Sequence, residues 1–153
     1  MRIYLDTCCY NRPYDDQLQI RIHDESEAVL SILHRSRATD NIILGSDVLR
    51  WEISQITDTF RRFKVLALYQ AAKEIIPYNE DIKTQAASIQ TQTSIRSLDS
   101  LHIASAAWGK ADVFLTTDDR LLRACRKMSL SLRTLNPVSY LAEVIEHDGS
   151  EYQ

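Results

Sequence analysis

The chain has 153 residues, of which 44% are hydrophobic and 25% are charged, a composition that fits one globular domain and excludes an intrinsically disordered protein. Only three glycines occur, so the sequence holds neither a glycine-rich dinucleotide fingerprint nor a phosphate-binding P-loop. The 18 basic and 21 acidic side chains give a net charge of −3, which excludes a global positive field. A nucleic-acid partner would therefore need local basic patches or metal ions.

The cysteine pattern and the absence of long apolar runs indicate the compartment. Cys8, Cys9 and Cys125 form no Cys-x-x-Cys pair, and their odd number favours a reducing environment and argues against a structural zinc site. No apolar run approaches the roughly 20 residues that cross a bilayer, and Met1 leads directly into a strand-like segment instead of a signal sequence. We therefore expect a cytoplasmic protein.

The first third of the chain predicts two strands separated by a loop and a helix. Residues 3–5 form a β-favouring run that ends at Asp6, and residues 7–17 are rich in turn formers and predict a loop. An apolar stripe from about Ile22 to Arg35 predicts an amphipathic helix. Residues 42–44 predict a buried strand, after which Ser46 is expected to cap the next helix.

The middle of the chain predicts helices. One holds Leu49 to Ile56, and a second begins at Thr57 or Asp58, continues to about Glu74 and ends before Pro77. A third helix is expected over residues 79–91.

The last third predicts alternating helices and strands. The segment from Asp99 to Trp108 favours a helix that stops at Gly109. The remaining expected elements are a strand over 113–115, a helix opened by Thr117 or Asp118, a short strand over 132–135, a helix over 138–145 and a frayed polar tail over 146–153. Short apolar strands that alternate with helices predict one α/β domain over residues 1–145, with a parallel sheet covered by helices on both faces.

Four carboxylates lie at positions that a parallel α/β fold brings together at one edge of its sheet. Asp6 follows the first strand, Glu52 lies on the helix after the second, and Asp99 and Asp118 open the helices on either side of the third. Because sites in parallel sheets form at the carboxyl ends of the strands, we expect these side chains to converge. Clustered carboxylates repel one another unless a cation neutralises them, and oxygen ligands favour Mg²⁺ or Mn²⁺ over Zn²⁺.

Four segments, in this order and spacing, resemble the PIN-domain family over residues 2 to about 140. They are Ile3-Tyr4-Leu5-Asp6-Thr7, the Ser46-x5-Glu52 spacing, Leu98-Asp99-Ser100-Leu101-His102-Ile103-Ala104-Ser105-Ala106 and Phe114-Leu115-Thr116-Thr117-Asp118. The resemblance implies a three-layer fold with a central parallel sheet and a Mg²⁺- or Mn²⁺-dependent ribonuclease that attacks single-stranded RNA. Small members of this length look like the VapC toxins of toxin–antitoxin pairs, which implies a homodimer and a small antitoxin partner.

The resemblance also implies roles for individual residues. The catalytic set comprises Asp6, Glu52, Asp99 and Asp118, of which Asp6, Asp99 and Asp118 are the expected ligands of one or two metal ions. Asp119 is an alternative to Asp118. Cys8 departs from the family pattern, which often has Asn or Ser at that position.

Neighbouring polar residues have two interpretations. Thr7, Arg12 and Arg120 are expected to contact the RNA, whereas a solvated surface is the ordinary explanation for exposed arginines. His102, three residues after Asp99 on the same helical face, is expected to be a hydrogen-bonded packing residue rather than a metal ligand or base.

Two other functions remain open from the sequence. A degenerate PIN domain would bind RNA or a protein partner without cleavage, and Cys8 is the feature that favours it. A phosphoryl-transfer site of another α/β fold is less consistent with the sequence, because a haloacid-dehalogenase-like phosphatase needs an Asp where Cys8 stands.

Overall fold

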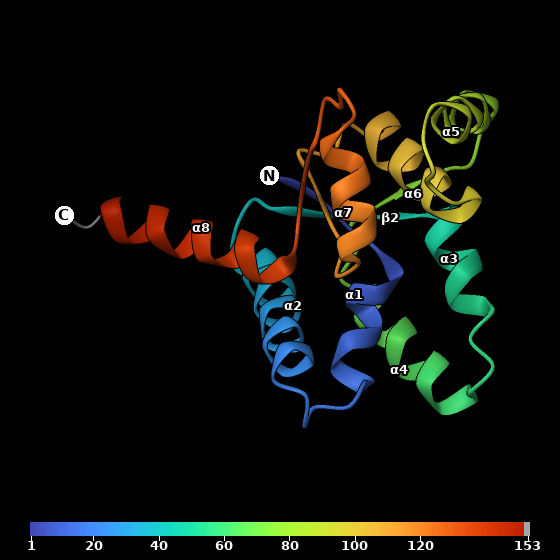
Figure 1. The fold of residues 1–153 in the computed structure, drawn as a ribbon. Coiled ribbons are helices and arrows are strands. Elements are labelled where there is room, and N and C mark those ends of the chain that lie inside the picture. The colour runs from blue at the N-terminus through green and yellow to red at the C-terminus, as the bar shows by residue number, and fades with distance from the viewer. Residues whose placement is uncertain (152–153) are drawn as a thin grey trace.

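A sheet of five parallel strands forms the centre of the protein within residues 1–151, which are the residues that the computed structural model describes (Figure 1). The strands are β1 (Arg2–Leu5), β2 (Ile42–Ser46), β3 (Glu74–Ile76), β4 (Val113–Leu115) and β5 (Arg133–Leu135). Their order across the sheet is β3-β2-β1-β4-β5, and every neighbouring pair is parallel. The predicted α/β fold is confirmed, as are the four strands expected from short apolar runs.

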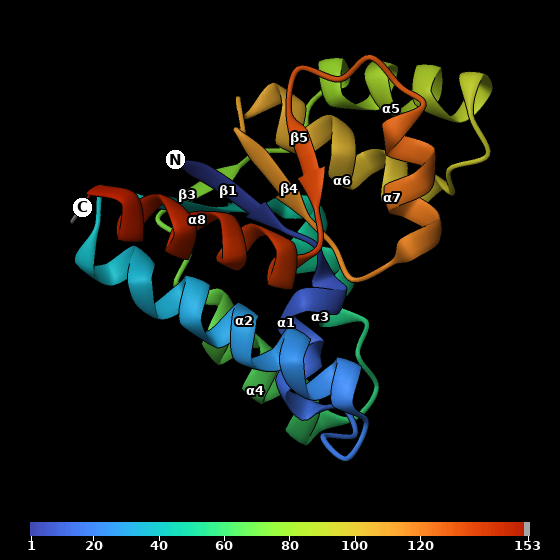
Figure 2. The same cartoon turned by 60° about the vertical axis from the view of Figure 1, so that its left-hand side comes forward.

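Helices cover the two faces of this sheet. The helices are α1 (Thr7–Asn11), α2 (Ile20–Ala38), α3 (Asp47–Ser54), α4 (Thr59–Tyr69), α5 (Glu80–Gln92), α6 (Ser97–Trp108), α7 (Asp119–Arg126) and α8 (Pro137–Glu151), and a short 3₁₀ turn, η1, spans Arg12–Tyr14. Helices α2 and α8 pack together on one side of the sheet, and α5 and α6 pack together on the other (Figures 1 and 2). The domain therefore has three layers.

Side-chain caps begin several helices where the sequence predicts them. The Ser46 hydroxyl accepts a hydrogen bond from the Leu49 amide, and the Asn79 side chain accepts one from Ile82. Asp58 accepts hydrogen bonds from the amides of Phe60 and Arg61. These caps satisfy amides that have no partner inside the helix, which fixes where each helix starts.

Three expectations are wrong in detail. The loop expected over residues 7–17 contains α1 and η1. The helix expected to reach Glu74 ends at Tyr69, and the chain then forms β3, which pairs with β2. At the end of the chain α8 continues to Glu151, beyond the predicted end at Ile145, while residues 152–153 of the expected tail lie outside the described residues.

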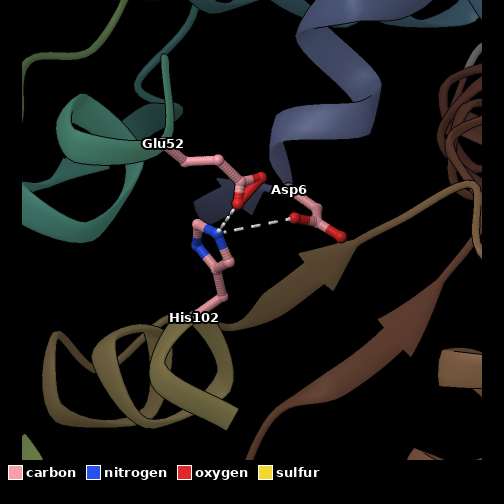
Figure 3. Close-up of side chains that lie close together, drawn as sticks. All are labelled: Asp6, Glu52 and His102. Carbon is pink, nitrogen blue, oxygen red and sulfur yellow. Dashed lines mark hydrogen bonds and ion pairs between the residues drawn. The ribbon is translucent and has the colours of Figure 1, made fainter. Parts of the chain in front are cut away.

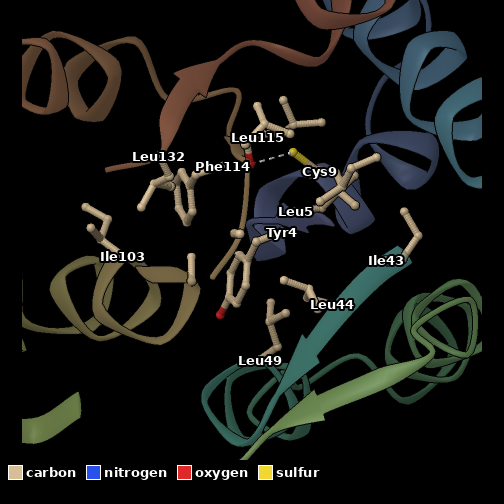
Figure 4. Close-up of a cluster of buried hydrophobic side chains, with 14 of the residues drawn as sticks. Tyr4, Leu5, Cys9, Ile43, Leu44, Leu49, Ile103, Phe114, Leu115 and Leu132 are labelled. Atoms are coloured by element: carbon tan, nitrogen blue, oxygen red, sulfur yellow. Dashed lines mark hydrogen bonds between the residues drawn. The ribbon is translucent and has the colours of Figure 1, made fainter. Parts of the chain in front are cut away.

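The core lies on both sides of β1 and β4, the two strands at the middle of the molecule. Tyr4, Leu5 and Phe114 are fully buried, and the Tyr4 and Phe114 rings stack with centroids 5.5 Å apart (Figure 4). Leu44 and Ile103 contribute from β2 and α6. Because β1 is buried on both faces, the residue that follows it, Asp6, is held in a fixed place.

Gly45 in β2 permits a close approach between the sheet and α4. A Cβ at this position would overlap the hydroxyl of Tyr69, which itself donates a hydrogen bond to the Ser46 carbonyl, and would lie 2.6 Å from Ile75 Cδ1. Gly149 in α8, by contrast, has open space around it.

Replacement of Gly45 by alanine is expected to lower the free energy of unfolding by about 1–3 kcal/mol, because the extra methyl group overpacks this contact. The matched variant Gly149→Ala should raise it by up to about 1 kcal/mol, because alanine favours a helix more than glycine does. Denaturant unfolding measures both. Equal effects of the two variants would contradict the close approach at Gly45.

Candidate active site

Asp6 follows β1 at the point where the connections of the sheet change direction. The chain moves from β1 to β2 and β3 on one side and then crosses to β4 and β5 on the other, so the carboxyl ends of β1 and β4 flank the crevice where parallel sheets place their ligands. Asp6 is 5% exposed. Its backbone amide donates to the Leu115 carbonyl at 2.9 Å, which ties the end of β1 to the end of β4.

Both oxygens of the Asp6 carboxylate are hydrogen-bonded. Oδ1 accepts from the Thr7 amide at 2.8 Å and so caps α1, and Oδ2 accepts from the Thr116 hydroxyl at 2.9 Å. The Cys8 thiol also lies 3.6 Å from Oδ2 and 3.3 Å from the Thr116 hydroxyl. Cys8, the departure from the family pattern, therefore lies beside this carboxylate, and its thiol is a weak additional donor to it.

Glu52 reaches the same space from α3 and contacts a buried histidine. Its Oε2 accepts a hydrogen bond from His102 Nε2 at 3.1 Å, and the same nitrogen lies 3.9 Å from Asp6 Oδ1 (Figure 3). The other ring nitrogen of His102 is hydrogen-bonded to the Tyr4 hydroxyl at 2.7 Å, and this hydroxyl is bonded to that of Ser46 at 2.8 Å. A buried chain of polar side chains thus fixes the orientation of the imidazole.

His102 and Glu52 shift each other's pKa. Burial lowers the pKa of His102, but the hydrogen bond to Glu52 and the negative charges of Asp6, Glu52 and Asp99 outweigh this effect and raise it. Burial raises the pKa of Glu52, and the hydrogen bond and charge of His102 outweigh that and lower it. The pair is therefore favoured as imidazolium and carboxylate.

One compact group of potential metal ligands exists among residues 1–151. Asp6, Glu52 and His102 each offer one atom, and these atoms lie within 4.8 Å of one another. From the sequence we expect the carboxylates of Asp6 and Glu52 to belong to the candidate site and His102 to be a hydrogen-bonded packing residue. His102 is buried and hydrogen-bonded as expected, but its partner is a carboxylate of the candidate site. The spacing from Asp99 to His102, one helical turn, is the signal that points to this position.

Asp99 and Asp118 lie beside this group and line one hollow of about 360 Å³. Burial raises the pKa of Asp99 to about 6, with further increases from the charges of Asp6, Asp118 and Glu52 and an opposing decrease from His102. The four predicted carboxylates are therefore close enough to repel one another, although only Asp6 and Glu52 belong to the compact group with His102.

Asp118 and Asp119 have different environments. Asp118 Oδ1 caps α7 by accepting from the amides of Arg120 and Leu121, and the side chain lines the hollow with Asp99. Asp119 instead forms a bidentate ion pair with Arg21, with both distances at 2.8 Å. The geometry therefore favours Asp118 over Asp119, the choice that spacing alone suggests.

The expected RNA contacts also have different environments. The Thr7 hydroxyl is buried and lies near the Glu52 carboxylate, whose pKa it helps to lower, without a well-formed hydrogen bond to any described residue. Arg120 is exposed and lines the hollow with Asp99 and Asp118. Arg12, however, is held inside the fold by Glu25 at 3.0 Å and Asp15 at 3.1 Å. Because its guanidinium is already bound to two carboxylates, Arg12 is less available to a phosphate than Arg120 is.

The donor set fits a divalent cation. Its carboxylates are the oxygen ligands that Mg²⁺ or Mn²⁺ prefers, whereas both ring nitrogens of His102 are already hydrogen-bonded, to Tyr4 and Glu52. The unpartnered Thr7 hydroxyl is a buried polar atom beside Asp6 that a metal-bound water would satisfy. Burial raises the pKa of Asp99 most, and the negative charges of Asp6, Asp118 and Glu52 raise it further; a cation would offset this part of the shift.

The chain matches one known domain family in sequence and resembles solved structures in fold. The family model of the PIN domain matches residues 3–127. Among solved structures, the chain is similar to VapBC2 from Rickettsia felis bound to a DNA fragment from its promoter, at 15% identity and a TM-score of 0.62, over 89% of this chain and 98% of that one. It is also similar to VapBC-5 from Mycobacterium tuberculosis, a member of the VapBC family of toxin–antitoxin systems, at 17% identity and a TM-score of 0.53, over 88% and 98%. No curated protein sequence matches the chain.

In the metal-free protein, Asp99→Asn is expected to stabilise the fold at neutral pH. The pKa of Asp99 is raised to about 6 in the folded protein, above the ordinary 3.8. The free energy of unfolding therefore falls as the pH rises from about 4 to about 6. Asparagine carries no charge and avoids this loss of stability. With a discount for solvent screening, the gain at pH 7.5 should be about 1–2 kcal/mol and should vanish near pH 4.

Denaturant unfolding in EDTA at the two pH values tests this prediction. The exposed Asp40→Asn variant, which removes the same charge far from the cluster, serves as the control and should show no such gain. A stability gain for Asp99→Asn that is equal at both pH values would show that ionisation of Asp99 is not its cause.

His102→Leu is expected to lower the free energy of unfolding by about 2–4 kcal/mol, because it leaves the half-buried Glu52 carboxylate and the Tyr4 hydroxyl without this partner. His34, an exposed histidine on α2, provides the control His34→Leu, whose effect should stay within about 0.5 kcal/mol. Thermal and denaturant unfolding measure both, and equal effects would contradict the assigned contacts.

Proposed function

The chain belongs to the PIN-domain family, and on this premise we propose that it is a Mg²⁺- or Mn²⁺-dependent endoribonuclease that hydrolyses phosphodiester bonds of single-stranded RNA. PIN domains are generally metal-dependent nucleases. The observation that carries the proposal is the gathering of carboxylates from four separate segments at the carboxyl ends of β1 and β4, where the charges of Asp6, Asp118 and Glu52 raise the pKa of Asp99 further beyond the effect of its burial.

Asp6, Asp99 and Asp118 are the proposed metal ligands. Asp6 is held rigidly by the Thr7 amide and the Thr116 hydroxyl, and Asp99 and Asp118 approach from the N-terminal ends of α6 and α7. A bound divalent cation would supply an activated water and neutralise the charge that develops on the phosphate.

Glu52 is the proposed proton acceptor of the catalytic set. The hydrogen bond from His102 engages Oε2 of this carboxylate, which leaves the other oxygen to accept a proton from the attacking water. His102 acts here as a positioning residue, because it holds Glu52 toward Asp6 while Tyr4 holds the imidazole from the other side.

Thr7 and Arg120 are the proposed substrate contacts. The buried Thr7 hydroxyl, unpartnered in the described part of the chain, can orient a water or a phosphate oxygen. The exposed Arg120 lines the hollow with Asp99 and Asp118 and can bind a neighbouring phosphate.

We further propose that the protein is the toxin of a toxin–antitoxin pair and acts in the cytoplasm as a homodimer with a small antitoxin partner. The similarity to chains of VapBC complexes supports this assignment. On α4, Phe60 and Phe63 are 72% and 74% exposed and Leu66 is 41% exposed, and an apolar helix face of this kind suits a dimer contact. No helix within residues 1–151 is long and apolar enough to cross a membrane.

The purified protein is expected to cleave single-stranded RNA in Mn²⁺ or Mg²⁺ and to lose this activity in EDTA. Asp6→Asn and Asp99→Asn should each reduce the cleavage rate by about 100-fold or more, since loss of a ligand exceeds the 10- to 100-fold effect of losing an outer hydrogen bond. Separately, Mn²⁺ at about 100 times its dissociation constant should stabilise the fold by about 2.7 kcal/mol.

Asp40→Asn, which removes an exposed carboxylate outside the cluster, should leave cleavage unchanged. Cleavage that survives both Asp6→Asn and Asp99→Asn would show that the proposed site is wrong. A parent protein that binds RNA but does not cleave it at any metal concentration would instead be a degenerate PIN domain.

A further inference from the structure

A second hollow opens from the one that holds Asp99 and Asp118. It has a volume of about 600 Å³ and lies between α7 and the segment that joins α5 to α6. The two hollows share Ser94, Arg120 and Ala124, so they form one continuous groove. Figure 2 shows α5, α6 and α7 on the same side of the molecule. The groove therefore begins at the carboxylates and extends along α7.

The outer part of this groove is basic. Arg120, Arg123 and Lys127 line it, together with polar side chains of Gln92, Thr93 and Ser129, and none of its lining residues is acidic. Spacings of three and four residues place the three cations on one face of α7 and its C-cap, over about 10 Å of helix. A row of positive charge thus leads away from the negative cluster.

These cations form no ion pair with a carboxylate among residues 1–151, and neither does Arg96, which lines the inner hollow together with Asp99. Other arginines of the fold are ion-paired, among them Arg2 with Glu74 and Arg133 with Glu143. Arg126, on the same helix, faces a different hollow that contains Asp119. The groove that leaves the site is therefore lined by four cations that form no ion pair in the described part of the chain.

We propose that this groove, lined by Arg96, Arg120, Arg123 and Lys127, is the track that holds the phosphates of single-stranded RNA on one side of the scissile bond. The proposal rests on the proposed nuclease function and specifies the path of its substrate beyond the single contact at Arg120. A polyanion fits because the outer groove offers three cations and neutral hydrogen-bond donors and no opposing carboxylate. Because the net charge is −3, RNA binding depends on local basic patches or metal ions, and this groove supplies such a patch.

The salt dependence of RNA binding tests the track. Each phosphate contact on a single strand contributes about 0.7 to the slope of log affinity against log salt, so the double variant Arg123→Gln/Lys127→Gln should reduce the magnitude of this slope by about 1.4 and weaken binding by about 20- to 30-fold at 0.1 M salt. Fluorescence anisotropy with a labelled single-stranded oligoribonucleotide of mixed sequence, in EDTA, measures the slope without cleavage.

The control variant removes the same charge at the opposite edge of the sheet. Arg37 and Lys110 are exposed and precede β2 and β4, so Arg37→Gln/Lys110→Gln should leave slope and affinity unchanged. All four substituted side chains are exposed, and unchanged thermal unfolding would show that the variants fold.

The proposed track and the proposed function can fail separately. A slope that is unchanged in Arg123→Gln/Lys127→Gln, or reduced equally by the control, overturns the track even if the protein cleaves RNA, and would leave the groove to an acidic protein segment. A reduced slope in a protein that never cleaves RNA supports the track and overturns the nuclease. A parent protein that does not bind the oligoribonucleotide overturns the track.

Discussion

The fold brings four carboxylates together at the carboxyl end of its sheet, where their negative charges repel one another. This repulsion is the constraint on which the rest of the site depends. Asp6 is buried at the end of β1, Glu52 faces it from α3, and Asp99 and Asp118 line the adjoining hollow. The fold offsets part of this repulsion with hydrogen bonds to Asp6 and with the imidazole of His102. The pKa of Asp99 is raised mainly by burial and further by the charges of Asp6, Asp118 and Glu52, so part of the repulsion remains. That residual negative charge is the physical reason to expect a divalent cation, and with it phosphodiester chemistry.

Local structure and the site are built from the same side chains. Asp6 caps α1, Ser46 caps α3 and Asp118 caps α7, so the hydrogen bonds that start these three helices also orient groups at or beside the cluster. Ser46 further supports Tyr4, which supports His102, which holds Glu52. A substitution in the buried chain is therefore expected to affect both stability and the geometry of the carboxylates.

Much of the fold could be predicted from the sequence because its signals are local. Apolar runs identified β1, β2, β4 and β5, and cap residues identified the starts of α3, α4, α5 and α7. The strand β3 was missed because it has only three residues, follows a helical pattern without a turn former and is defined by its pairing with β2. Helix α1 is not predicted because it has only five residues and its start depends on capping by Asp6, whose position is set by the end of β1.

The individual partners within the site could not be predicted in the same way. Order along the chain indicated Asp6, Glu52, Asp99 and Asp118, and their catalytic roles remain predictions. That His102 contacts Glu52 while Arg12 pairs with Glu25 follows from contacts between segments far apart in sequence.

Location of the metal is the most direct test of the account. A crystal of the protein soaked in Mn²⁺ should show an anomalous scattering peak coordinated by the Asp6 carboxylate, within reach of Asp99 and Asp118. The absence of a peak at saturating Mn²⁺, with these carboxylates ordered and directed into bulk water, would contradict the central claim.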